Sequence, residues 1–360
     1  MAVEPPAPRL EAVYLYLTGD CNQRCRHCWV DAAHVTRPRT GRPLSVDEIM
    51  RALLPARDLG VTSVKISGGE PFLRADAAAI IAALRAADFA VVIETNGTLI
   101  DEPLADALAR AGVGQISVSL DGATATTHDA FRGQPGAFAR TRRAIERLRA
   151  RELNVQVLTT LTRASAGEID ELLDLCAELD VDSFKLNFLV PMGRGVDLHR
   201  RGEALPVRQI LEVARHVEQE RGPGLPFGVS TALPPAFTPR ARLREGDGHV
   251  CPIANILGVL DDGRLSLCGI GYLAPELVVG DLRRDSIARV WSEAPLLRQL
   301  RDRPHARLQG VCARCILRRT CVGSCRANAF AQHRDLWAPF WLCEEAEREG
   351  VFPPARLLQT

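Results

Sequence analysis

Short apolar runs alternate with longer amphipathic stretches over residues 11–230. The short runs have the length and β-branched content of buried strands, and the longer stretches repeat apolar positions with the spacing of a helix. Strands are predicted at 13–18, 62–67, 90–94, 115–120, 154–161 and 183–190. Helices are predicted at 46–58, 75–88, 102–111, 137–151, 167–179 and 206–220. These units predict an α/β fold with a parallel sheet, a partial (β/α)6 TIM-like barrel, because a closed barrel needs eight strands.

Residues 222–248 interrupt the pattern because Gly, Pro and Arg accumulate there, which predicts a domain boundary. A β-hairpin is predicted next, with strands at 256–260 and 264–267 around an Asp-Asp-Gly turn. The chain beyond the boundary is rich in cysteine. The expected organisation is an N-terminal tail (1–10), the partial barrel (11–235), a linker (236–250), a small Cys-rich domain (251–345) and a C-terminal tail (346–360).

The charges balance, with 45 basic and 44 acidic residues, and this gives no reason to expect nucleic acid or an anionic membrane as a partner. Lys65 and Lys185 are the only lysines, which we attribute first to codon bias. No apolar run reaches the roughly 18 residues of a membrane helix, and the first residues do not resemble a secretion signal. We therefore expect a cytoplasmic protein. In that compartment, its 11 cysteines indicate metal binding or catalysis rather than disulfides.

Three cysteines with C-x3-C-x2-C spacing directly follow the first predicted strand: Cys21, Cys25 and Cys28. Three thiolates can bind three irons of a four-iron cluster and leave the fourth iron without a protein ligand. An open iron can bind a further molecule, so the triplet indicates a catalytic cofactor rather than a structural one. Cys176 lies alone in a predicted amphipathic helix, and we expect it to be a buried structural thiol.

Four other polar or Gly-rich motifs also follow predicted strands: Gly68-Gly69-Glu70-Pro71, Thr95-Asn96-Gly97, Ser117–Gly122 and Pro191–Arg194. Loops after the strands of a parallel barrel share its C-terminal face, so we expect all five motifs on one rim. Two consecutive glycines let the backbone approach a ligand closely, and their carbonyls can accept bonds from an ammonium group. From the residues alone, the glycines can equally form a simple turn and Glu70 can be a solvated loop acid.

Seven more cysteines lie near the C-terminus: Cys251, Cys268, Cys312, Cys315, Cys321, Cys325 and Cys343. A C-x2-C pair followed by another pair is also typical of a zinc site. A zinc ion with four thiolates would leave three thiols unused. One iron–sulfur cluster with four thiolates and one with three would use all seven.

The triplet, together with Gly-Gly-Glu-Pro after the second strand, resembles the radical S-adenosylmethionine (SAM) superfamily over about residues 11–230. This resemblance implies that Cys21, Cys25 and Cys28 hold a [4Fe-4S] cluster whose open iron binds SAM. Reductive cleavage of SAM then yields a 5′-deoxyadenosyl radical that abstracts hydrogen from a substrate. The resemblance also implies that the following residues contact the cofactor: His27, Gly68, Gly69, Glu70, Pro71, Ser119, Arg132 and Met192. An arginine suits the SAM carboxylate because its guanidinium can bind both oxygens.

The second cysteine set resembles the SPASM domain over about residues 251–345. By that resemblance, one auxiliary [4Fe-4S] cluster is held by Cys312, Cys315, Cys321 and Cys343, and another by Cys251, Cys268 and Cys325. Three clusters are therefore expected. Some relatives have an eighth cysteine shortly after the position of Cys251, and this chain has none there. One iron of the second auxiliary cluster is thus left open, or bound by water, a non-Cys side chain or substrate, and it is expected to accept electrons or anchor substrate.

The SPASM resemblance implies a maturase that crosslinks, oxidises or epimerises a ribosomal peptide or a protein. Only a short stretch precedes the first strand, so either a separate protein or the barrel itself is expected to recognise a leader peptide. A flavodoxin or ferredoxin is the expected reductant. Two alternatives stay open: the same radical chemistry on a small molecule such as a sugar or aminocyclitol, and a zinc-binding interaction protein without catalysis.

Overall fold

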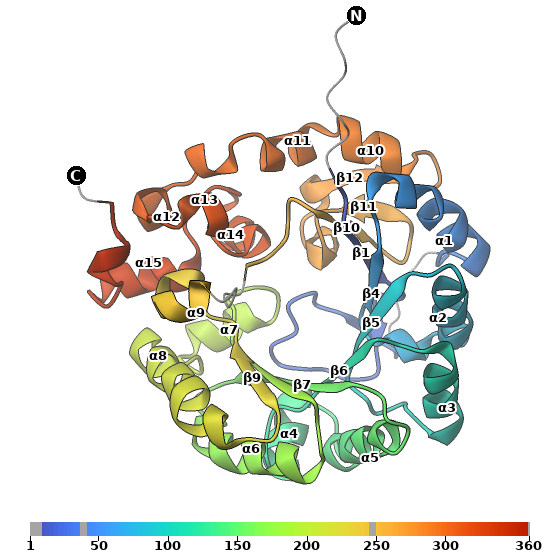
Figure 1. The fold of residues 1–360 in the computed structure, drawn as a ribbon, viewed down its shortest axis with the longest axis horizontal. Coiled ribbons are helices and arrows are strands. Elements are labelled where there is room, and N and C mark those ends of the chain that lie inside the picture. The colour runs from blue at the N-terminus through green and yellow to red at the C-terminus, as the bar shows by residue number, and fades with distance from the viewer. Residues whose placement is uncertain (1–8, 37–41, 245–249, 359–360) are drawn as a thin grey trace, which may run out of the picture.

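The computed structural model describes residues 9–36, 42–244 and 250–358. Residues 1–8 of the expected N-terminal tail, 245–249 of the linker and 359–360 of the C-terminal tail lie outside the described residues. All six predicted strands are present, parallel and paired in chain order: β1 (Ala12–Tyr16), β4 (Ser63–Ser67), β5 (Ala90–Thr95), β6 (Gln115–Ser119), β7 (Val155–Leu161) and β8 (Ser183–Phe188). Figure 1 shows these strands as a curved wall, which confirms the partial barrel.

The outer side of the wall is covered by helices at the predicted places: α1 (Val46–Leu53), α2 (Ala77–Ala86), α3 (Glu102–Ala111), α5 (Ala137–Arg149), α6 (Ile169–Glu178) and α8 (Val207–Arg215). Ser45 begins α1 with a capping box, in which its hydroxyl accepts from the Glu48 N–H and its own N–H donates to the Glu48 carboxylate. Within the barrel, the described helices α4 (Ala125–Arg132) and α7 (Gly195–Arg200) were not predicted. Both are short and carry few apolar residues, so the periodic pattern is weak there.

Successive side chains along each strand point to opposite faces of the wall. On β4, Val64 and Ile66 are at most 1% exposed and belong to the hydrophobic core that includes helix residues such as Ile80. Between them, Lys65 points to the opposite, inner face of the wall, where its ammonium lies near the Tyr14 ring of β1. The core therefore lies between strands and helices, and the inner face carries polar groups.

The sheet continues beyond the six predicted strands at both edges. A seventh parallel strand, β9 (Gly228–Thr231), pairs with β8 inside the segment that we interpreted as a break. It was missed because it has only four residues and Gly and Pro surround it. At the other edge, β10 (Ile256–Val259) pairs in parallel with β1. The predicted hairpin of β10 and β11 (Arg264–Ser266) is confirmed, and β12 (Val278–Asp281) follows it, so the Cys-rich domain shares the barrel sheet.

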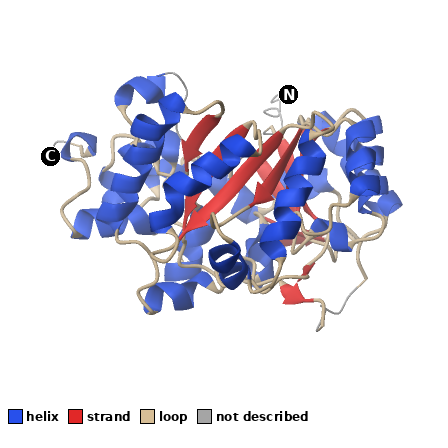
Figure 2. Cartoon of the chain, turned by 90° about the horizontal axis from the view of Figure 1, so that it is seen from below, coloured by secondary structure: helices blue, strands red, loops and turns tan. Residues whose placement is uncertain are grey.

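The rest of the Cys-rich domain is helical: α10 (Ile287–Glu293), α11 (Pro295–Arg301), α12 (Gly310–Arg314), α13 (Arg318–Cys321), α14 (Arg326–His333) and α15 (Trp341–Arg348). Figure 2 shows the strands running through the centre of the molecule with helices along their flanks. Near the C-terminus, Arg356 donates to the backbone carbonyls of Ala236 and Thr238, beside α9 (Arg240–Arg244) of the linker. Within the described ranges, no helix has the length and apolar character needed to cross a membrane.

Candidate active site and cluster-binding cysteines

The loop that carries the first three cysteines crosses the C-terminal rim of the barrel. Its two short strands, β2 (Asp20–Cys21) and β3 (Ala33–His34), pair with each other and fold it back. Cys21 and Cys25 are buried, and Cys28 is half-buried. Burial, followed by the charges of Glu70 and Cys25, raises the pKa of Cys21 to about 12. A bound metal is therefore needed to hold this thiol as a thiolate at neutral pH.

Each of the three sulfurs accepts a hydrogen bond. The Gln23 N–H donates to Cys21 Sγ at 3.4 Å, and the Ala32 N–H donates to Cys28 Sγ at 3.5 Å. The third donor is Nη1 of Arg132, which lies 3.7 Å from Cys25 Sγ. Such bonds stabilise thiolates and tune the potential of iron–sulfur clusters, so this donor set fits a cluster.

Arg132, at the end of α4, is held on both sides. Its Nη2 forms an ion pair with Asp121 Oδ2 at 2.5 Å, and the fully buried Asp121 also accepts from the Thr160 N–H at 2.7 Å. The structure thus places Arg132 against Cys25 and Asp121, where the resemblance implied a contact with the SAM carboxylate. Among the described residues, its buried Nε has no hydrogen-bond partner, and neither has Nε2 of the neighbouring Gln23. These two buried donors fit a polar molecule bound beside the triplet.

Gly68 and Gly69 make contact with the backbone of the cysteine loop. The Gly69 N–H donates to the Thr18 carbonyl at 2.7 Å, and the Glu70 N–H donates to the Asp20 carbonyl at 2.8 Å. A Cβ on Gly68, whose φ is +146°, would lie 2.4 Å from the Thr18 carbonyl oxygen. The sequence left two interpretations of these glycines open, close approach of a ligand and a simple turn. In the structure, both glycines lie against the backbone of the cysteine loop.

Glu70 is fully buried, and both its carboxylate oxygens are engaged. Oε1 accepts from Thr95 Oγ1 at 2.7 Å and from the Phe72 N–H at 3.2 Å, and Oε2 accepts from the Asn96 N–H at 2.8 Å. Burial raises its pKa to about 7 against the opposing effect of these bonds. Glu70 therefore ties the loop after β4, in which Pro71 begins a 3-10 turn (Pro71–Leu73), to the loop after β5. This places it as a positioning residue rather than a solvated acid.

A network of amides beside the triplet was not recognised in the sequence. Asn96 Nδ2 donates to Asn22 Oδ1 at 2.8 Å and lies 3.9 Å from Cys21 Sγ, and Asn22 Nδ2 donates to Thr98 Oγ1 at 2.9 Å. The sequence predicted Thr95-Asn96-Gly97 on the rim, but it predicted no contact between this motif and the cysteines. The sequence feature that could have indicated this network was a second asparagine, Asn22, inside the cysteine motif.

His27, within the cysteine loop, and Ser119, on β6, lie in different environments. The His27 ring stacks on Phe131 of α4, with 4.3 Å between ring centroids and 10° between planes. Burial lowers the pKa of His27 and keeps its ring neutral. Ser119 is half-buried at the end of β6.

Met192, which was expected to contact the cofactor, is only 4% exposed and packs in the hydrophobic core. Its loop reaches the triplet through the next two residues instead. The Arg194 N–H donates to the Cys28 carbonyl at 3.0 Å, and a Cβ on Gly193 would lie 2.5 Å from that same oxygen. The loops after β1, β4, β5, β6 and β8 therefore meet on one rim, as the five motifs predicted.

Gly69→Ala tests this backbone contact. The added Cβ would lie 1.9 Å from the Asp20 carbonyl oxygen, so the two segments must separate. Because displacements near 1 Å cost about a hundredfold in rate at active sites, SAM cleavage should fall by about that factor. The measurement is 5′-deoxyadenosine formation per cluster under reducing conditions.

Gly167→Ala is the matched control, because nothing lies within 4 Å of its Cβ position. Equal activity of the two variants, each normalised to its iron content, would contradict the role given to the contact.

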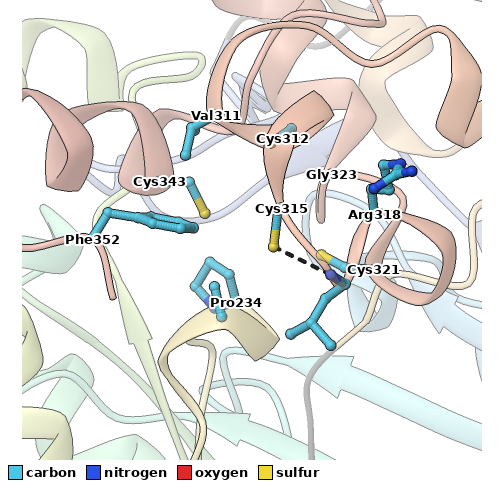
Figure 3. Close-up of a pocket in the computed structure, with 11 residues that line it drawn as sticks. Pro234, Val311, Cys312, Cys315, Arg318, Cys321, Gly323, Cys343 and Phe352 are labelled. Atoms are coloured by element: carbon cyan, nitrogen blue, oxygen red, sulfur yellow. Dashed lines mark hydrogen bonds between the residues drawn. The ribbon is translucent and has the colours of Figure 1, made fainter. Parts of the chain in front are cut away.

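Four C-terminal thiols line a small cavity in the Cys-rich domain: Cys312, Cys315, Cys321 and Cys343. Figure 3 shows them together with Pro234 and Phe352. The Phe340 N–H donates to Cys312 Sγ, and the Ser324 N–H donates to Cys321 Sγ, at 3.4 and 3.2 Å. A hydrogen bond from Cys343 lowers the pKa of Cys312 to about 7. These thiols and their donors fit a cluster with four thiolates.

The other three thiols, Cys251, Cys268 and Cys325, form a separate group, which we call the three-cysteine set. Burial and then the charge of Cys325 raise the pKa of Cys251 and of Cys268, that of Cys268 to about 12. The charge of Lys65, on the inner face of the barrel, opposes both shifts. Four of the seven thiols thus line one cavity, and the other three act on one another. In the described part of the chain, no group of three or more His, Cys, Asp or Glu side chains is arranged around a single metal ion.

Comparison with known proteins identifies the family. The radical SAM superfamily profile matches residues 15–188, and the SPASM profile, an iron–sulfur cluster-binding domain, matches residues 251–316. The AdoMet-dependent heme synthase of Methanosarcina barkeri is 33% identical over 91% of this chain and 94% of that protein. The chain belongs to the radical SAM superfamily. Another radical SAM relative is the pre-heme d1 synthase of Dinoroseobacter shibae, 30% identical over 89% of this chain and 83% of that protein.

The same fold occurs in SuiB of Streptococcus suis, solved with S-adenosylmethionine bound. It superposes with a TM-score of 0.72 at 20% identity, over 94% of this chain and 78% of SuiB. As a radical SAM enzyme with a SPASM domain, the protein uses iron–sulfur clusters and SAM. This excludes the hypothesis of a non-catalytic zinc-binding protein.

Proposed function

We propose that this radical SAM/SPASM enzyme modifies a peripheral side chain of a tetrapyrrole. The proposal rests on one observation: three relatives of this chain have names that refer to tetrapyrroles. Besides the two enzymes above, the Fe-coproporphyrin III synthase of M. barkeri is 26% identical over 92% of this chain. All three are named for tetrapyrrole products. A tetrapyrrole is a small molecule, which was the second class of substrate that the sequence left open.

In this proposal, Cys21, Cys25 and Cys28 hold the SAM-binding cluster. A four-iron cluster with one open iron, together with SAM, supplies a carbon-centred radical that removes a hydrogen atom from a substrate. The chain positions and encloses this chemistry. Glu70 fixes the loop that contains Gly68, Gly69 and Pro71 against the triplet, and Arg132 donates to Cys25. Buried Nε of Arg132 and Nε2 of Gln23, with Ser119 and His27 nearby, are the groups we assign to SAM.

The C-terminal thiols hold two auxiliary clusters in this proposal, for three clusters in all. Cys312, Cys315, Cys321 and Cys343 form a full ligand set. The three-cysteine set would leave one iron of its cluster without a thiolate. Because thiolate number and solvent access tune the cluster potential, this set is the one suited to accept an electron from a modified substrate.

Iron analysis tests the number of clusters. The anaerobically reconstituted enzyme should contain about twelve irons and about twelve sulfides per chain, four for each cluster. Elemental analysis with Mössbauer spectroscopy provides the measurement. A content near eight with a fully occupied triplet would show that one auxiliary set does not hold a four-iron cluster.

The substrate class is tested by turnover with Fe-coproporphyrin III, SAM and a low-potential reductant. The tetrapyrrole should raise 5′-deoxyadenosine formation above the substrate-free rate and should itself change mass. With tetrapyrrole deuterated on its side chains, deuterium should appear in 5′-deoxyadenosine. If neither change occurs with Fe-coproporphyrin III or the metal-free porphyrin, the tetrapyrrole proposal is wrong.

Maturation of a ribosomal peptide is the second candidate. The mycofactocin maturase MftC of Mycobacterium ulcerans is 29% identical over 87% of this chain, and this relative favours a peptide substrate. In that case, a separate leader-recognition protein is the expected partner. For either substrate we propose a flavodoxin or ferredoxin as electron donor. The same deuterium assay with a labelled precursor peptide separates the two candidates.

A further inference from the structure

Asn328 carries a buried amide next to one cysteine of the three-cysteine set. The residue is 1% exposed, and among the described residues neither its Nδ2 nor its Oδ1 has a hydrogen-bond partner. The amide has two N–H donors and an oxygen with two lone pairs. Because an unpaired polar group is costly to bury, an amide with both ends unpaired indicates a polar group that binds there in the assembled enzyme.

Helix α14 directs this amide toward Cys325. Cys325 is the N-cap residue of α14, and its Sγ accepts from the Asn328 N–H at 3.4 Å. Asn328 is therefore in the first turn, and side chains on a helix tilt toward its N-terminus. In a capping box, a side chain at this position accepts from the N–H of the N-cap residue. The Asn328 amide makes no bond of that kind to Cys325, so both its polar atoms are free to bind another group at this end of the helix.

The described neighbours of Asn328 on α14 do not pair with its amide. Ala327 and Phe330 are buried and belong to the hydrophobic core. Arg326 donates through both Nη atoms to backbone carbonyls of the surrounding loops. The group that pairs with the amide therefore comes from outside the helix, at its cysteine end.

A four-iron cluster with three thiolates matches both ends of this amide. The cluster sulfurs accept hydrogen bonds, which suits Nδ2. An iron that lacks a thiolate can take an oxygen ligand, which suits Oδ1. A cluster with four thiolates would match the donor end alone. Cys251, Cys268 and Cys325 supply three thiolates, and the segment shortly after Cys251 contains no further cysteine.

We propose that Asn328 is the fourth ligand of the cluster held by the three-cysteine set and binds the remaining iron through Oδ1. The inference rests on the auxiliary clusters of the proposed function and does not depend on the substrate. It selects a side chain among the alternatives of water, side chain and substrate that the sequence left open. Four protein ligands leave no coordination position for substrate, so this cluster accepts electrons and does not anchor substrate.

The test asks whether an exogenous ligand can reach that iron. The probe is isotopically labelled cyanide, added to the reduced, anaerobically reconstituted holoenzyme. The sample is frozen immediately after SAM is added at saturation, so that SAM occupies the open iron of the SAM-binding cluster. Electron–nuclear double resonance then detects labelled carbon bound to an auxiliary cluster. The wild type should show no such coupling. Asn328→Ala should bind cyanide, or lose that iron and show the EPR signal of a three-iron cluster.

Asn328→Asp and Asn328→Cys keep a ligand atom at this position. Both should exclude cyanide as the wild type does. Both should also lower the reduction potential of the cluster, because a carboxylate or a thiolate adds negative charge where the amide is neutral. Potentiometric titration followed by EPR measures that shift. If Asn328→Ala loses the whole cluster, Asn328→Cys must restore it, and Asn328→Leu, of similar size without a ligand atom, must not.

Asn255→Ala is the matched control. Asn255 is a half-buried amide in the segment after Cys251, and its backbone N–H and carbonyl are bonded to Pro252 and Glu11, so alanine removes the side-chain amide alone. This variant should exclude cyanide.

The inference is refuted if the wild type binds cyanide at an auxiliary cluster. It is equally refuted if Asn328→Ala keeps its cluster and excludes cyanide, or if Asn255→Ala opens the site and Asn328→Ala does not. An iron content of about eight in the wild type, with the three-cysteine set empty, would overturn the proposed number of clusters together with this inference. The substrate proposal stands or falls separately, by the turnover assay with Fe-coproporphyrin III.

Discussion

Replacing Cys28 by alanine is expected to abolish 5′-deoxyadenosine formation. Cys28 Sγ accepts from the Ala32 N–H, and the Cys28 carbonyl holds the loop after β8 through Arg194. Alanine keeps the backbone bond but removes one of the three thiolates assigned to the SAM-binding cluster. Two thiolates cannot retain a four-iron cluster with a single open iron. The measurement is 5′-deoxyadenosine per chain under reducing conditions, with iron content determined on the same sample.

Cys176→Ala is the matched control, because Cys176 is fully buried on α6, where burial raises the pKa of its thiol. That variant should keep its full iron content and its activity. Iron in Cys28→Ala should fall by about a third if three clusters are present. SAM cleavage at the wild-type rate by Cys28→Ala would show that the triplet does not hold the active cluster.

Arg326→Met is expected to have the largest effect on stability. Arg326 directly follows Cys325 and is fully buried, and its guanidinium donates to the carbonyls of Gly323, Leu336 (2.7 Å) and Ala338 (2.9 Å). Burial lowers the pKa of Arg326, and the charges of thiols from both auxiliary sets, led by Cys312 and Cys325, oppose that shift. Methionine would leave three carbonyls without a donor and remove the cation near both sets, which should cost about 3–5 kcal/mol.

The measurement is the thermal midpoint of the anaerobic holoenzyme, which should fall by roughly 5 °C or more, together with selective loss of auxiliary iron. Arg319→Met, at an exposed position of α13, should change neither quantity. Arg326→Lys should fall between the two, because an ammonium cannot span three carbonyls held in different directions. An unchanged midpoint and iron content in Arg326→Met would refute the role assigned to this arginine.

Most of the barrel could be predicted because its signals are local. The apolar runs that became β1 and β4–β8, the amphipathic helices between them, and the capping box at Ser45 each depend on residues close together in the chain. The short strand β9 and the helix α4 were missed because they carry little hydrophobic pattern and form through pairing and packing with distant elements. The parallel pairing of β10 with β1 joins residues more than 240 positions apart, and no local pattern reveals it.

The candidate site likewise has a part that local sequence predicted and a part that depends on long-range packing. Cysteine spacing indicated the triplet, and the resemblance to the SPASM domain implied both auxiliary sets. The contacts of Glu70, Arg132 and Met192 depend on which loops meet at the rim. Residue type alone therefore did not show that Glu70 accepts hydrogen bonds from Thr95 and Asn96. It also did not show that Met192 packs in the core.

By itself, the sequence determined the family and the strand–helix order, because both depend on motifs and on spacings of a few residues. Only the tertiary structure decided which backbone segments Gly68 and Gly69 must accommodate, and where the guanidinium of Arg326 is buried. It also decided that the side chains of Lys65 and Lys185 lie on the inner face of the sheet. These properties depend on the distance between atoms from different strands and loops, which is set by the curvature of the sheet and by long-range packing rather than by neighbours in the chain.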